Sequence, residues 1–85
     1  MRKVKIHKIY EHFKGDSYIV EGFCIDCETL KRCVLYRQLY GDGELYVRTE
    51  EDFLSEIDHK KYPNIKRKYR FTEKRIKSRR IEKWI

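Results

Sequence analysis

The chain lacks the long segments that membrane proteins and large enzymes need. Its 85 residues contain no apolar run near the roughly 18 residues of a membrane-spanning helix. Residues 1–7 lack the continuous apolar stretch of a signal peptide. A chain this short also excludes a multidomain enzyme with separate cofactor and substrate lobes. We therefore expect one small module in the cytoplasm.

Apolar residues are also scarce. Charged residues make up 41% of the chain and the hydrophobic set 40%, and the mean hydropathy is −0.87. Such a composition leaves apolar material for a thin core only. Phosphate-cradling glycine loops, metal-protease helices and nucleophile elbows are all missing from the sequence. We therefore predict that the protein is not an enzyme and binds no cofactor.

Cysteine is too sparse for a disulfide framework. Three cysteines are an odd number in a chain without an export signal, so reduced thiols are expected. The Cys24-x-x-Cys27 spacing, together with Cys33, suggests a zinc site. A structural zinc site needs four ligands, however, and the sequence has no second pair of ligand residues. The histidines are scattered along the chain: His7, His12 and His59. The sequence therefore predicts no metal site.

The positive charge is confined to one end of the chain. Residues 1–59 hold nine Lys/Arg and twelve Asp/Glu, whereas residues 60–85 hold twelve Lys/Arg and two Glu. A segment so charged repels itself and needs compensation by water and salt, by an acidic patch on the same chain, or by an anionic partner. Nucleic acid, DNA or RNA, is the commonest such partner.

Aromatic residues are interleaved with these cations, at Tyr62, Tyr69, Phe71 and Trp84. Cations bind phosphates and exposed aromatic rings can stack on bases, so this pattern predicts nucleic-acid binding without sequence selection. The predicted contacts are Lys66, Arg67, Lys68, Arg70, Lys74, Arg75, Lys77, Arg79, Arg80 and Lys83. Two alternatives remain open: a merely solvated tail, or an adaptor whose aromatic face takes a peptide while the tail docks on an acidic protein.

The first fifty residues read as short strands joined by turns. Segments 3–13, 17–25, 30–40 and 44–48 are rich in β-branched and aromatic residues. Gly15 and the pair Gly41 and Gly43 supply the turn conformations between them. Gly22 lies inside the second segment, where a bulge or sharp bend is expected. Consecutive hairpins predict an antiparallel meander.

The spacing of apolar residues changes from strand-like to helical after residue 48. Thr49 precedes three acidic residues and an apolar pattern of helical spacing, which predicts a helix of about one or two turns. Segment 65–71 alternates apolar and basic residues, as a last strand would. From Thr72, a candidate N-cap, a basic helix is expected. The predicted fold is mainly β: a small SH3-like barrel or strongly bent antiparallel meander of roughly four to five strands over residues 1–71, with a helical extension over residues 72–85.

Several short motifs, taken together, form a specific pattern. They are YEHFKG (10–15), YIVEG (18–22), ETL (28–30), VLYRQLYGD (34–42), LYVR (45–48) and Phe53. Over about residues 9–71 this order resembles a short bacterial family, domain-of-unknown-function family 1653. The resemblance implies a compact, β-rich, SH3-like domain, and it carries no established activity or catalytic residue. We expect a monomer.

The resemblance also singles out a set of polar and aromatic residues. If the meander closes, Arg37 and Arg48 lie on neighbouring strands and could both reach Glu28 or an external anion. Alternatively, an Arg-Glu pair satisfies buried polar groups at a hairpin, with the tyrosines as core and rim. The candidate residues of this barrel-face site are Glu28, Thr29, Tyr36, Arg37, Tyr46 and Arg48.

Overall fold

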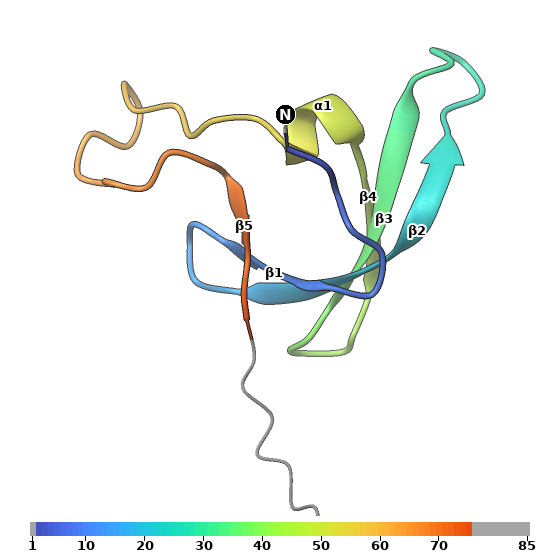
Figure 1. The fold of residues 1–85 in the computed structure, drawn as a ribbon, viewed down its shortest axis with the longest axis horizontal. Coiled ribbons are helices and arrows are strands. Elements are labelled where there is room, and N and C mark those ends of the chain that lie inside the picture. The colour runs from blue at the N-terminus through green and yellow to red at the C-terminus, as the bar shows by residue number, and fades with distance from the viewer. Residues whose placement is uncertain (1, 76–85) are drawn as a thin grey trace, which may run out of the picture.

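The computed structural model describes residues 2–75 and shows one mainly β unit (Figure 1). Its elements are β1 (Ile9–His12), β2 (Ser17–Ile25), β3 (Arg32–Gln38), β4 (Leu45–Thr49), α1 (Glu50–Phe53) and β5 (Phe71–Glu73). The strands form a five-stranded sheet in the order β4-β3-β2-β1-β5, with every neighbouring pair antiparallel. The predicted mainly β class and the antiparallel meander are confirmed.

Tight turns between the strands explain why β1 to β4 pair with their neighbours in sequence. Gly15, Gly41 and Gly43 have φ angles of 109°, 56° and 65°, a region that residues with a Cβ rarely adopt. The turn before β2 contains Gly15, and the turn between β3 and β4 contains the other two. The predicted turn chemistry at these glycines is therefore confirmed.

A bulge bends the longest strand, β2. The register with β3 shifts between Val20 and Gly22, so that Glu21 is the extra residue. Val20 lies opposite Tyr36 and Phe23 lies opposite Val34, so two β2 residues three apart share one face of the sheet, which a regular strand forbids. The bend predicted at Gly22 is present, and it curls the sheet around its inner face (Figure 1).

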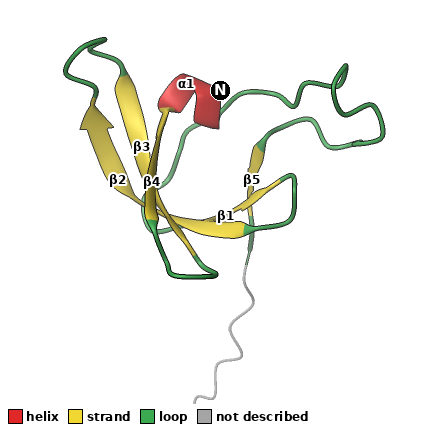
Figure 2. Cartoon of the chain, turned by 180° about the vertical axis from the view of Figure 1, so that it is seen from behind, coloured by secondary structure: helices red, strands yellow, loops and turns green. Residues whose placement is uncertain are grey.

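The short helix α1 begins where the cap was expected. The Thr49 hydroxyl accepts a hydrogen bond of 3.2 Å from the Asp52 backbone N–H, and three acidic residues lie in the first turn near the positive end of the helix. The helix follows β4 directly (Figure 2). Its last residue, Phe53, is buried in the core cluster with Val20 and Val34.

Aromatic side chains make up most of the core. The fully buried side chains are Phe53, Phe71, Val20 and Val34. Tyr10, Tyr18 and Tyr36 complete the centre of the cluster, and their rings meet the two phenylalanines edge-on with centroids 5.3–5.9 Å apart. A few large aromatic rings thus supply most of the buried apolar area in a domain that has few apolar residues.

The sheet is open, which corrects the barrel prediction. Strands β4 and β5 are its two edges, and no pairing joins them among residues 2–75. β5 contains only three residues, and all of them pair with β1. The sheet is therefore not closed into a barrel within the described residues, and the bent meander is the alternative that the structure supports.

The C-terminal part of the predicted element order also changes. The last strand was expected over residues 65–71, but residues 68–70 instead bond with the loop after α1: Ile57 N–H donates to Lys68 O and Arg70 N–H donates to Ser55 O. Thr72, the expected N-cap, lies within β5 opposite Glu11, so a helix does not begin there. The rest of that predicted helix, residues 76–85, lies outside the described residues.

Candidate functional site

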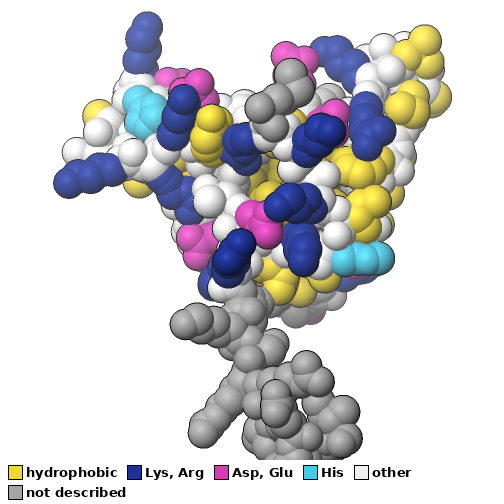
Figure 3. Space-filling view, viewed as in Figure 1, with side chains coloured by type: hydrophobic (Ala, Val, Ile, Leu, Met, Phe, Trp, Pro, Cys, Tyr) yellow, Lys and Arg dark blue, Asp and Glu magenta, His cyan; other side chains and the backbone are white. Residues whose placement is uncertain are grey.

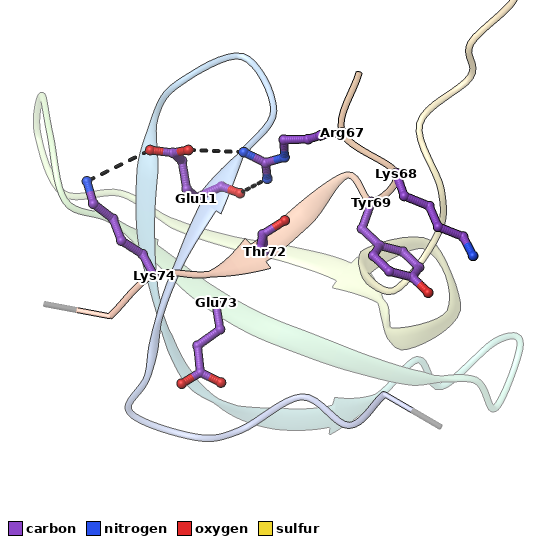
Figure 4. Close-up of a pocket in the computed structure, with 7 residues that line it drawn as sticks. All are labelled: Glu11, Arg67, Lys68, Tyr69, Thr72, Glu73 and Lys74. Carbon is purple, nitrogen blue, oxygen red and sulfur yellow. Dashed lines mark hydrogen bonds and ion pairs between the residues drawn. The ribbon is translucent and has the colours of Figure 1, made fainter. Parts of the chain in front are cut away.

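Two shallow hollows flank the edge strand β5 and share Glu73 and Lys74. The first, of about 400 Å³, is drawn in Figure 4. Its lining residues are Glu11, Arg67, Lys68, Tyr69, Thr72, Glu73 and Lys74. The second, of about 870 Å³, is lined by Lys5, His7, Lys8, Ile9, Glu73, Lys74 and Arg75. We call this surface the β5 edge.

Glu11 organises the first hollow. Arg67 Nη1 lies 3.0 Å from Glu11 Oε1, and Arg67 Nη2 donates to the Glu11 backbone oxygen at 2.6 Å. Lys74 Nζ approaches the other carboxylate oxygen, Oε2, at 3.8 Å. Figure 4 shows the two cations meeting Glu11 from different sides. One carboxylate therefore holds two cations from separate parts of the chain next to each other.

The β5 edge keeps a surplus of positive charge after its ion pairs are made. Lys5 Nζ pairs with Glu73 Oε1 at 3.1 Å, so both acids of the surface are engaged. The six cations that line the two hollows are Lys5, Lys8, Arg67, Lys68, Lys74 and Arg75. Lys and Arg side chains are widespread on the face shown in Figure 3, with acidic side chains lying among them. Six cations against two carboxylates make an anion-attracting surface.

The Tyr69 ring of the β5 edge is already in contact with a cation. The Arg2 guanidinium carbon lies 3.8 Å from the centroid of the Tyr69 ring, and Lys68 Nζ lies 5.4 Å from it. The same arginine donates from Nη2 to the Phe71 backbone oxygen at 2.7 Å. Tyr69 therefore fixes the N-terminal segment on the strand, and it offers less ring surface for stacking than its sequence position suggested.

The structure gathers some of the residues predicted to bind nucleic acid and separates others. Arg67, Lys68, Lys74 and Arg75 line the β5 edge. Arg70 donates from Nε to the Ser55 hydroxyl at 3.2 Å, and Lys66 is exposed on the loop that precedes β5. The remaining predicted contacts lie outside the described residues: Lys77, Arg79, Arg80 and Lys83.

Two cations of the β5 edge, Lys5 and Lys8, were missed by the sequence analysis. They belong to residues 1–59, which carry a net negative charge, so the charge count pointed away from them. They meet the basic segment because β1 pairs with β5, and the Lys74 N–H donates to the Ile9 backbone oxygen at 2.8 Å. Long-range strand pairing of this kind leaves no mark in local sequence.

The predicted barrel-face site does not form. Val34 opposes Arg48 and Tyr36 opposes Tyr46, so Arg48 lies on the inner face with both tyrosines, whereas Arg37 opposes Leu45 on the outer face. The Arg37 guanidinium donates to the Gly43 backbone oxygen at 2.9 Å and lies 3.9 Å from Glu21. The expected convergence of the two arginines is therefore wrong. Arg48 pairs with Val34, and Arg37 lies three residues after Val34 on β3, so the two arginine side chains point to opposite faces of the sheet.

The acidic partner expected for these arginines lies elsewhere as well. Glu28 and Thr29 are exposed in the turn between β2 and β3. Their backbone N–H groups donate to Asp26 Oδ1 at 2.9 and 3.4 Å, and these bonds lower the pKa of Asp26. The two residues thus belong to a turn stabilised by an aspartate, and they take no part in a site with Arg37 or Arg48.

Arg48 has a structural network of its own. Its Nε donates to the Tyr36 hydroxyl at 3.1 Å, and its Nη1 pairs with Asp52 Oδ2 in the first turn of α1. Burial acts to lower the pKa of Arg48, but the hydrogen bonds to Tyr36 and Asp52 outweigh it and raise that pKa. Its Nε and Nη1 thus join β3, β4 and α1, with Tyr36 and Asp52 as partners.

His12 lies beside this network and is held neutral. Burial, followed by the charges of Arg48 and Arg70, lowers its pKa from 6.5 to about 4. Its Nδ1 accepts from the Lys14 backbone N–H at 3.2 Å, and its ring meets Phe71 edge-on with centroids 4.9 Å apart. His12 is therefore a neutral, partly buried ring packed on Phe71 near neutral pH.

Within residues 2–75, no helix has the length and apolar character needed to cross a lipid bilayer. Over the same residues, no group of three or more His, Cys, Asp and Glu side chains is placed to hold a metal ion.

The geometry defines a small, bent, open antiparallel sheet with a cationic edge. Residues 8–73 match the model of a family described as "Protein of unknown function (DUF1653)", and the chain belongs to that family. The match confirms the resemblance drawn from the motifs. No curated protein and no solved structure matches the chain.

Proposed function

We propose that this chain is a non-catalytic module that binds nucleic acid without sequence selection, through the β5 edge and the basic residues that follow it in sequence. The observation that carries the proposal is the gathering of six cations around two carboxylates on one edge of the sheet. Residues 76–85 add four Lys/Arg and one Glu directly after this edge. Nucleic-acid phosphates are the polyanion that suits such a surplus of cations best.

The side chains at this edge suit phosphates better than bases. Lysines predominate in the second hollow, and they act as point charges that carry no base information. Arg67 is tied to Glu11 and Tyr69 to Arg2, which limits bidentate base recognition and stacking. Binding of this kind gives affinity that depends on charge and backbone spacing.

The test is a titration of fluorescently labelled single- and double-stranded oligonucleotides, followed by anisotropy. Changing Lys8, Lys68 and Lys74 to glutamine should weaken binding at least about tenfold, because each lost phosphate contact removes released counterions. The matched control changes three exposed lysines outside the β5 edge, Lys14, Lys31 and Lys60. An equal loss in both triple variants would assign binding to net charge alone and would contradict a site at β5.

A second candidate function is a protein-interaction adaptor. The observation that favours it is the edge strand β4, which pairs only with β3 among residues 2–75 and whose Leu45 and Val47 are 44% and 59% exposed on the outer face. A peptide strand could add to such an edge while the basic segment docks on an acidic partner. Val47→Arg separates the two candidates: it should leave oligonucleotide affinity intact and abolish peptide binding at β4.

A further inference from the structure

The three cysteines meet at the far end of the β2–β3 hairpin, away from the β5 edge. They line one hollow of about 400 Å³ with four other residues. The members of this thiol hollow are Cys24, Asp26, Cys27, Cys33, Val47, Arg48 and Thr49. A regular strand would place Cys24 and Cys27 on opposite faces, but β2 ends at Ile25 and the turn that follows brings Cys27 back toward the strands.

Cys24 and Cys33 are directly opposite each other on β2 and β3. Opposed residues of antiparallel strands point to the same face, with Cα atoms about 4.5–5.5 Å apart. That separation falls within the roughly 4.4–6.8 Å over which a disulfide joins two cysteines. The strand pairing therefore places the two Cα atoms at a separation that a disulfide can join, without a change of register.

The three thiols differ in their access to solvent. Cys33 is buried, Cys24 is partly exposed and Cys27 is exposed. Burial, followed by the nearby Cys24 and Asp26, raises the pKa of Cys33, and its Sγ donates to the Lys31 backbone oxygen at 3.7 Å. A thiol in this state reacts poorly with outside reagents. Within the opposed pair, an external reagent therefore meets Cys24 first.

We propose that Cys24 and Cys33 are a thiol modification site, which a low-molecular-weight disulfide oxidises to a reversible cross-strand bond. The Cys24 thiolate attacks one sulfur of the reagent RSSR, which forms a mixed disulfide and releases RS⁻. Cys33 then loses its proton and attacks the Cys24 sulfur, which expels the second RS⁻. The two protein thiols give up two electrons and two protons, and the reagent leaves as two RSH.

The second step is fast because it is intramolecular. Cys33 is held opposite Cys24 by the strand pairing, so its low thiolate fraction is offset by proximity. Cys27 lines the same hollow from the turn and lies outside the strand pairing, so the register selects Cys33 as the partner. The product would tie β2 to β3 next to β4, because Cys33 also opposes Thr49.

The experiment uses the full chain, incubated folded with excess oxidised glutathione, then blocked with an alkylating reagent and digested with trypsin and Asp-N. The cleavages separate the cysteines into peptides 16–25, 26–31 and 33–37. We expect a linked pair of peptides 16–25 and 33–37, reversed by dithiothreitol, in the wild type and in Cys27→Ser. Cys24→Ser and Cys33→Ser should lose that link, and Cys33→Ser should retain a glutathione mixed disulfide on Cys24.

A parallel incubation in strong denaturant is the control for native register. There the short loop between Cys24 and Cys27 should compete, and the native pair should lose its dominance. Three fully alkylated cysteines in the folded wild type, or a dominant link through peptide 26–31, would overturn the proposal. Because the variants lie far from β5, this outcome leaves the nucleic-acid proposal untouched.

Discussion

Phe53 and Phe71 stack face to face, with ring centroids 4.2 Å apart and an interplanar angle of 6°. Phe53 ends the short helix α1 and Phe71 begins the last strand, β5. Both rings are almost completely buried, at 0% and 1% exposure. This one contact therefore joins the helix side of the bent sheet to the strand that carries the cationic edge.

Replacing Phe71 by alanine should cost about 3–5 kcal/mol of folding free energy, because a fully buried ring leaves a cavity that the thin core cannot fill. Urea denaturation followed by circular dichroism measures the loss. The neighbouring exposed residue provides the control, since Thr72→Ala should change stability by less than about 0.5 kcal/mol. A cost below about 1 kcal/mol for Phe71→Ala would contradict the role of the stacked pair.

The Arg48 network predicts energetic coupling with Tyr36. The Arg48 Nε bond to the Tyr36 hydroxyl is partly buried, so the two changes Tyr36→Phe and Arg48→Met should each destabilise by about 1–3 kcal/mol. A double-mutant cycle should give a coupling of about 1 kcal/mol. Oligonucleotide affinity should stay constant in both variants. An Arg48 variant that keeps its stability and loses nucleic-acid binding would instead place Arg48 in the site.

His12 predicts a pH dependence of stability in a defined window. Its pKa is lowered from 6.5 to about 4 in the folded chain, so the unfolded chain binds more protons between these values. The stability that the neutral His12 contributes to the folded chain is fully present above about pH 6.5 and is lost as the pH falls toward about 4. His12→Phe keeps the ring contacts and removes the titration.

The measurement is the urea midpoint of wild type and His12→Phe at several pH values. The difference between the two proteins cancels the carboxylates that titrate in the same range. We expect the wild type to lose stability relative to the variant as pH falls through the window. A constant difference, or an NMR titration of His12 centred near 6.5, would contradict a partly buried imidazole that stays neutral.

Leu30 predicts a stabilising substitution. It has a φ of 60° and is 76% exposed. Its left-handed backbone conformation is therefore strained, and its side chain buries little surface that could offset the strain. Leu30→Gly should raise stability by up to about 1 kcal/mol, since the strain of about 1–2 kcal/mol exceeds the added chain entropy of glycine. Leu39, an exposed leucine outside the left-handed region, is the control. Leu39→Gly should destabilise in the same thermal melt.

Local features of the sequence were sufficient for the second strand, the turns and the helix cap. The second strand was predicted at 17–25 and is observed as Ser17–Ile25, because alternation and flanking turn residues act within a few positions of each other. The first strand was predicted too long, at 3–13, whereas β1 is Ile9–His12. Residues 3–8 instead run beside the core, where Val4 is 8% exposed.

Long-range pairing was not readable from the sequence. Segment 65–71 has a strand-like alternation, yet the backbone of residues 68–70 bonds with the loop after α1 and the strand begins at Phe71. The pairing of β1 with β5 brings Lys5 and Lys8 into the same hollow as Lys74. Likewise, the faces of Arg37 and Arg48 depended on a register that only the folded hairpin fixes.

The most direct measurement is the salt dependence of binding to a labelled DNA duplex. The logarithm of the binding constant should fall linearly with the logarithm of the salt concentration, with a slope of about −0.9 for each phosphate contacted. In the triple glutamine variant of Lys8, Lys68 and Lys74, the magnitude of this slope should be smaller by about 2–3. The control triple of Lys14, Lys31 and Lys60 should keep the wild-type slope. Binding that ignores salt, or no binding at about 50 mM salt, would contradict a cationic edge that contacts phosphates.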